Sequence, residues 1–147
     1  MSEPELRAFL SQPLVGALTT LGPDGYPHTV GMWFVPREAS IEMWTYAKSQ
    51  KARNAARDPR CSFMVDEGRR YEELRGVLVR GRLEIVTDTE RVEEIGRRLY
   101  DRYTLPYTGV SVDEGPIVEV RRQATKRVGL LLALDDVASW DHRKLGS

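Results

Sequence analysis

Residues 15–35 read VGALTTL, GPDG and YPHTVGMWFV, and this stretch decides the fold. Two runs of apolar and β-branched side chains flank residues 22–25, where glycine, proline and aspartate supply the chemistry of a tight turn. We therefore expect a strand over residues 15–21, a hairpin turn, and a second strand over residues 26–35. Because the turn leads into a strand and not into a helix, it is not a phosphate-binding loop of the Walker or Rossmann kind.

Four more segments have the composition of strands: residues 41–46, 61–65, 74–86 and 128–134. The first three strands follow one another through short turns, so we expect them to form an antiparallel meander. Gly76 and Gly81 permit bends or bulges in the long segment 74–86. Residues 138–144 read as partly extended.

Helices are expected at the ends of these strands. Ser2 and Glu5 form a capping box that opens a first helix, and residues 87–103 repeat apolar side chains at helical spacing behind a second such box. A short helix follows Ser49 and ends at Asp58-Pro59, while residues 116–123 fit either a helix or a strand. The pattern predicts a mainly β, α+β fold: a small closed or split antiparallel barrel of about six strands with peripheral helices, in a single domain over residues 1–147.

Composition excludes several classes of function. The 147 residues hold 22 basic and 22 acidic side chains, which removes the electrostatic expectation of a nucleic-acid partner. No apolar run is long enough to span a membrane. The N-terminus is acidic without an apolar signal core, and Cys61 has no second cysteine to pair with, so we expect a cytoplasmic protein.

The residues that usually perform nucleophilic or metal chemistry are scarce. The chain has two histidines, His28 and His142, one cysteine, and none of the HExxH, GxSxG or CxxC motifs. We therefore expect no metal site and assign no catalytic residue from the sequence.

The segment KSQKARN at residues 48–54 carries the strongest chemical signal. It opens the short helix directly after the aromatic run Trp44-Thr45-Tyr46, so free backbone N–H groups and the positive end of a helix dipole coincide with two lysines. Phosphate binding requires such donors and charge. The pattern fits a phosphate clamp beside an apolar slot for a flavin-type cofactor; a solvated basic helix without a ligand is the alternative.

The order of these segments resembles the FMN-binding split-barrel superfamily, which includes the pyridoxamine-phosphate-oxidase-like proteins. The resemblance rests on residues 17–28, ALTTLGPDGYPH, on KSQKARN, and on RDPRCS at residues 57–62, and it covers about residues 6–140. The helix-end motif is most similar to the actinobacterial branch that uses the deazaflavin coenzyme F420.

The resemblance implies a six-stranded split barrel, a homodimer and two cofactor sites at the dimer interface. It implies coenzyme F420, or alternatively FMN, as the cofactor. Lys51 would hold the phosphate, with Lys48, Ser49, Gln50 and Asn54 nearby. The ring would lie along Met32, Trp33 and Phe34 and along Trp44, Thr45 and Tyr46. The partner subunit could contribute Tyr107 or Trp140.

The family's substrate motif, of the form R-L-x-P near the C-terminus, is replaced here by Arg143-Lys144-Leu145-Gly146, so pyridoxamine phosphate is not the expected substrate. The expected function is hydride transfer from reduced F420 to a small conjugated or aromatic acceptor, because the cofactor supplies the chemistry and the protein needs few acid–base groups. Tyr46 or Tyr107 could donate a proton. The alternatives are an FMN-dependent oxidase or reductase and a non-catalytic protein that binds a flavin-like or haem-like molecule.

Overall fold

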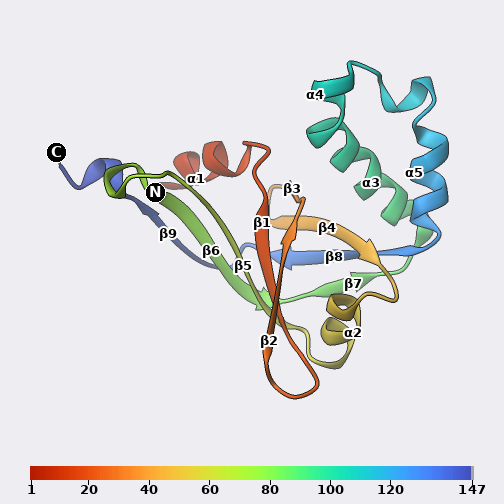
Figure 1. Cartoon of the computed structure of the whole chain (residues 1–147), viewed down its shortest axis with the longest axis horizontal. Coiled ribbons are helices and arrows are strands. Elements are labelled where there is room, and N and C mark those ends of the chain that lie inside the picture. The colour runs from red at the N-terminus through yellow and green to blue at the C-terminus, as the bar shows by residue number, and fades with distance from the viewer. Residues whose placement is uncertain (147) are drawn as a thin grey trace.

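The computed structural model describes residues 1–146, and within them nine strands form two antiparallel sheets (Figure 1). One sheet has the order β2-β1-β5-β6-β9 and the other the order β3-β4-β8-β7. The strands are β1 Gly16–Leu21, β2 Pro27–Met32, β3 Val35–Pro36, β4 Ser40–Tyr46, β5 Arg60–Glu67, β6 Arg75–Arg82, β7 Glu84–Val86, β8 Arg127–Ala133 and β9 Asp136–Asp141. This arrangement confirms the predicted mainly antiparallel α+β class.

The strand count exceeds the predicted six because two predicted strands pass from one sheet to the other. Residues 26–35 divide at Trp33 and Phe34 into β2 and β3, and residues 74–86 divide at Leu83 into β6 and β7. The partly extended tail supplies β9, which pairs with β6. At each crossing the backbone begins to pair with strands of the other sheet. The alternation of side chains alone does not show where that change occurs.

The predicted three-strand meander forms, but it is divided between the two sheets. The hairpin β1–β2 forms as expected, with Leu21 opposite Pro27, but the other neighbour of β1 is β5. Strand β4 lies in the second sheet, between β3 and β8. Each consecutive pair of these predicted strands is therefore antiparallel, and the crossing at Trp33 and Phe34 moves the third strand into the other sheet.

The core lies between the two sheets. Its fully buried side chains include Leu18 and Phe63 from the five-stranded sheet and Met43, Leu130 and Leu132 from the four-stranded one. Gly16 permits the closest approach: a Cβ atom there would lie 2.0 Å from Cζ of Phe63.

The helices are α1 Glu3–Leu10, α2 Gln50–Arg57, α3 Thr89–Tyr103, α4 Leu105–Thr108 and α5 Ile117–Ala124, with short 3-10 turns at Tyr71–Glu73, Val112–Glu114 and His142–Lys144. Residues 116–123, whose sequence fits either a helix or a strand, are thus helical from Ile117 onward. The N-cap of α3 is Asp88, whose carboxylate accepts the N–H groups of Glu90 and Arg91, and not Thr87 as the predicted capping box had it. In Figure 1, α3, α4 and α5 form a lobe on one side of β4 and β8, and α2 lies below the end of β4.

A buried carboxylate fastens α3 to the four-stranded sheet. Glu42 on β4 is 8% exposed, and its carboxylate lies 3.2 Å from the Arg98 guanidinium on α3 and 3.1 Å from that of Arg37. A carboxylate out of water is stabilised when two guanidinium groups surround it. This contact fixes α3 over the strand that carries Trp44 and Tyr46.

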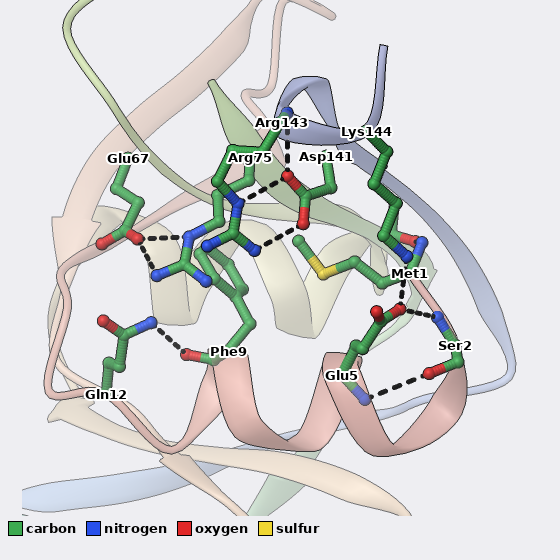
Figure 2. Close-up of polar contacts among 11 residues, drawn as sticks. Met1, Ser2, Glu5, Phe9, Gln12, Glu67, Arg75, Asp141, Arg143 and Lys144 are labelled. Carbon is green, nitrogen blue, oxygen red and sulfur yellow. Dashed lines mark hydrogen bonds and ion pairs between the residues drawn. The ribbon is translucent and has the colours of Figure 1, made fainter. Parts of the chain in front are cut away.

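The two ends of the described chain meet beside α1 (Figure 2). Ser2 and Glu5 form the predicted capping box, and the Glu5 carboxylate also lies 2.8 Å from Nζ of Lys144. These contacts lower the pKa of Glu5 to about 2, with the Lys144 hydrogen bond as the largest cause. The Met1 ammonium donates to the hydroxyl of Ser139 on β9. The network fixes α1 against the far edge of the five-stranded sheet, away from α2.

Among residues 1–146, no helix is long and apolar enough to cross a membrane.

Candidate functional site

The start of α2 is built by its N-cap. The Ser49 hydroxyl accepts the N–H of Ala52 and the hydroxyl proton of Thr45, each at 3.2 Å. The backbone N–H groups of Gln50 and Lys51 lie in the first turn, where no intrahelical acceptor exists. The helix therefore presents free donors and the positive end of its dipole, as the sequence predicted.

Two cations come close together beside this helix start. Lys51 is half-buried, and its pKa is lowered by burial first and by the positive charge of Arg127 second. Among residues 1–146, no ion pair joins Lys48, Lys51 or Arg127 to a carboxylate, although the chain is neutral as a whole. Desolvation and like charge both disfavour the protonated amine, and an anion bound between the two groups would relieve both.

Arg127 connects the helix start to aromatic side chains. Its guanidinium carbon lies 4.1 Å from the ring centroid of Tyr46 and 4.6 Å from that of Trp44. Its Nε donates to the side-chain oxygen of Gln123 at 3.4 Å. The first residue of β8 is Arg127, and it pairs across the sheet with Tyr46. Sequence reasoning missed this residue, since its role depends on pairing between strands 80 residues apart.

A shallow pocket of about 300 Å³ adjoins these rings; we call it the aromatic pocket. Its lining residues are Gly31, Met32, Trp33, Trp44 and Arg127. Trp33 is 51% exposed, and one face of its indole stacks on the ring of Tyr103, with centroids 4.7 Å apart and planes at 2°. The pocket combines flat rings with a guanidinium group, which suits a flat molecule that carries negative charge.

The predicted site residues fall into two groups. At the surface lie Trp33, Tyr46, Lys48 and Gln50, with Ser49 and Lys51 half-buried. The side chains of the others are buried, and they are Met32, Phe34, Thr45 and Asn54.

The buried group supports the site from inside. Asn54 donates to the Thr20 hydroxyl at 3.1 Å and accepts hydrogen bonds from Gln50 and Arg57, so its amide is already occupied. Phe34 packs on Phe63 with ring centroids 5.2 Å apart. We assign Phe34, Thr45 and Asn54 to holding α2 and the sheet crossing in place, whereas Met32 also lines the aromatic pocket.

A larger hollow lies elsewhere and offers different chemistry. It has a volume of about 590 Å³ and lies between α1, the β3–β4 turn and the turn after β8. Its lining residues include Arg7, Arg37 and Glu38 but no aromatic side chain. It therefore has no surface on which a tricyclic ring could stack. No cluster of three or more possible metal ligands occurs among residues 1–146.

Comparison with known proteins places the chain in a family. Residues 2–141 match the family model described as pyridoxamine 5'-phosphate oxidase. The chain belongs to this family, as the resemblance of its motifs predicted.

Three individual proteins that resemble the chain add detail to the family match, and the names of two of them mention F420. Over 101 residues, the chain is 34% identical to an F420H2-dependent biliverdin reductase of Mycobacterium tuberculosis, covering 67% of this chain and 70% of that protein. A crystal structure of a conserved hypothetical protein of Mycobacterium tuberculosis matches with a TM-score of 0.89 and 44% identity over 100% of this chain and 89% of that one. A structure described as an F420 reductase matches with a TM-score of 0.68 and 28% identity over 90% and 94% of the two chains.

The proximity of Lys51 and Arg127 predicts that the pKa of Lys51 depends on the charge of Arg127. Replacing Arg127 by Gln removes the neighbouring positive charge and lets water approach, so the pKa of Lys51 should rise toward its ordinary value of 10.5. The protonated amine would then persist to higher pH. NMR titration of the lysine Cε and Hε resonances, assigned with Lys51→Arg, measures this. Arg53→Gln, on the exposed side of α2, is the control; a Lys51 pKa unchanged by Arg127→Gln would contradict the arrangement.

Proposed function

We propose that the protein is an F420-dependent oxidoreductase that reduces a small conjugated or aromatic acceptor. The observation that carries this proposal is the pair Lys51 and Arg127, which links a free helix start to the aromatic pocket. The named relatives support coenzyme F420 as the cofactor. The cofactor, when bound, supplies the hydride chemistry, and the protein provides binding, orientation and exclusion of water.

The start of α2 would hold the phosphate. The N–H groups of Gln50 and Lys51 and the Lys51 ammonium offer hydrogen bonds and charge. Arg127 and the exposed Lys48 add positive charge. Ser49 acts chiefly through its cap, because its hydroxyl already accepts from Ala52.

The aromatic pocket would hold the ring. The exposed indole of Trp33 offers a flat surface, and Trp44 closes the pocket under the Arg127 guanidinium. Two phenol hydroxyls are candidate proton donors: Tyr46, which lies against Arg127 and is 49% exposed, and Tyr107 on α4, which is 91% exposed and which a partner subunit could bring to the site. Either hydroxyl could pass a proton from solvent to the acceptor.

FMN remains the alternative cofactor, since it also carries a phosphate and a flat tricyclic ring. The visible spectrum of purified protein separates the two readily. A yellow protein with a flavin spectrum would indicate FMN. For the acceptor, biliverdin is the first compound to assay, because it is the substrate named for the relative of Mycobacterium tuberculosis.

We also propose that the protein is a homodimer. The face of the five-stranded sheet that points away from the core carries small and apolar side chains in one row across all five strands: Gly31, Ala17, Met64, Leu78 and Ala138. Met64 is 37% exposed and the adjoining Val15 is 57% exposed. A second copy would bury this apolar row. A cofactor site at that interface could then receive residues such as Tyr107 or Trp140 from the partner.

Loss of Lys51 should weaken cofactor binding. Lys51→Ala removes one charge-assisted hydrogen bond, which is worth about 1.5–3 kcal/mol, or roughly 10- to 150-fold in the dissociation constant of F420. Fluorescence titration of F420 measures this. Lys144→Ala, beside α1 at the other end of the molecule, is the matched control and should bind normally. Equal affinity of Lys51→Ala and the unaltered protein would remove the phosphate assignment.

A charge in the apolar row should separate the dimer. Met64→Arg and Leu78→Arg should each yield a monomer by sedimentation velocity, because two copies would face each other with buried positive charge. Glu72→Arg, on an exposed 3-10 turn, should leave the mass unchanged. If the unaltered protein sediments as a monomer, the proposed dimer is refuted, whereas the cofactor assignment is unaffected.

A further inference from the structure

We propose that Tyr103, at the end of α3, is a positioning residue for the cofactor ring and acts through Trp33. The inference rests on the proposed function, since it takes the aromatic pocket as the place of the ring. Neither the motif comparison nor the helical spacing of Tyr103 marks it as more than a packing residue. Its contacts indicate that Tyr103 also positions Trp33.

Trp33 and Phe34 lie where the chain crosses between the two sheets. Strand β2 ends at Met32 and β3 begins at Val35, so neither residue belongs to a strand. Phe34 is fully buried, and its backbone groups need other partners. The exposed Trp33 indole would otherwise stand on an unsupported two-residue link.

Tyr103 supplies that support through its hydroxyl. The Phe34 N–H donates to the Tyr103 oxygen at 3.2 Å. The Tyr103 hydroxyl donates to the carbonyl oxygen of Leu14 at 2.7 Å and lies 3.1 Å from the carbonyl oxygen of Phe34, its other acceptor. The Tyr103 side chain therefore holds both the sheet crossing at Phe34 and the segment at Leu14 that leads into β1. Tyr103 is 7% exposed, so these bonds are shielded from water.

The Tyr103 ring holds the indole directly. It stacks almost parallel to Trp33, which leaves the indole half exposed at the aromatic pocket. Arg102 fixes the arrangement from behind: its guanidinium lies 5.3 Å from the Tyr103 ring and 4.8 Å from the Phe34 ring, and it donates to the carbonyls of Leu10, Ser11 and Gln12.

The same helix also sets the second indole. Gly96 lies two turns before Tyr103, on the same face of α3. A Cβ atom at Gly96 would lie 2.4 Å from Cζ3 of Trp44, so the missing side chain makes room for that ring. Because Glu42 and Arg98 fasten α3 to β4, one helix face determines where both indoles stand.

The coupling can be seen without cofactor. In protein labelled with 5-fluorotryptophan, the 19F resonance of Trp33, assigned with Trp33→Phe, should carry the ring-current shift of the Tyr103 stack. Tyr103→Leu should remove that shift. Tyr103→Phe, which keeps the ring and removes the hydroxyl, should retain it but broaden the line. Tyr100→Phe, whose lost hydroxyl binds Val110 at the outer loop, is the control and should leave the resonance unchanged.

Binding of F420 then tests the positioning role. Trp33→Leu should weaken binding roughly 3- to 10-fold, the range for one lost aromatic stack, and Tyr103→Leu should weaken it similarly. If Tyr103 acts through Trp33, the double variant should bind no more weakly than Trp33→Leu alone. Circular dichroism confirms folding of each variant, and Tyr103→Phe, which should weaken binding to a smaller extent, serves if Tyr103→Leu does not fold.

The outcomes separate this inference from the proposed function. Additive losses, an undiminished affinity of the Tyr103 variants, or an unchanged Trp33 resonance in Tyr103→Leu would each overturn the positioning role while F420 binding by the unaltered protein stands. Failure of the unaltered protein to bind F420 would overturn the proposed function and this inference together.

Discussion

Two positive charges near each other in partly buried positions are the constraint on which the proposed site depends. Lys51 loses solvation at the start of α2 and faces Arg127 from β8, and no carboxylate among residues 1–146 forms an ion pair with either. Such an arrangement lowers the affinity of the amine for its own proton. We propose that this arrangement binds an anion, and the aromatic pocket next to Arg127 fits our proposal that the anion is one end of a flat molecule.

Local features of the site could be predicted from the sequence, because their causes are local. The cap at Ser49, the helix that follows it and the hairpin at residues 22–25 each depend on a few consecutive residues. Arg127 could not be found in this way, since only the pairing of β4 with β8 brings it over Tyr46. The same limit applies to Asn54: its position in the helix was correct, but its burial against Thr20 depends on how α2 packs on β1.

The sheet crossings show a second limit. Alternation of side chains continues through Trp33 and Phe34 and through Leu83, although the chain changes sheets at both points. The crossing at Trp33 has the greater consequence, because it frees an indole from the strand ladder and requires a support from α3. Through Tyr103, which stacks on Trp33, and Gly96, which leaves room for Trp44, helix α3 determines the shape of the aromatic pocket without lining it. In the proposed site, these residues serve the fold and the pocket together, and the helical lobe would be part of the binding architecture.

A crystal structure of the protein grown with coenzyme F420 tests the central claim most directly. The account predicts the phosphate within hydrogen-bond distance of the Gln50 and Lys51 N–H groups, beside the Lys51 ammonium and Arg127, with the tricyclic ring against Trp33. Density for the cofactor in the hollow beside α1, with the start of α2 facing solvent, would contradict it.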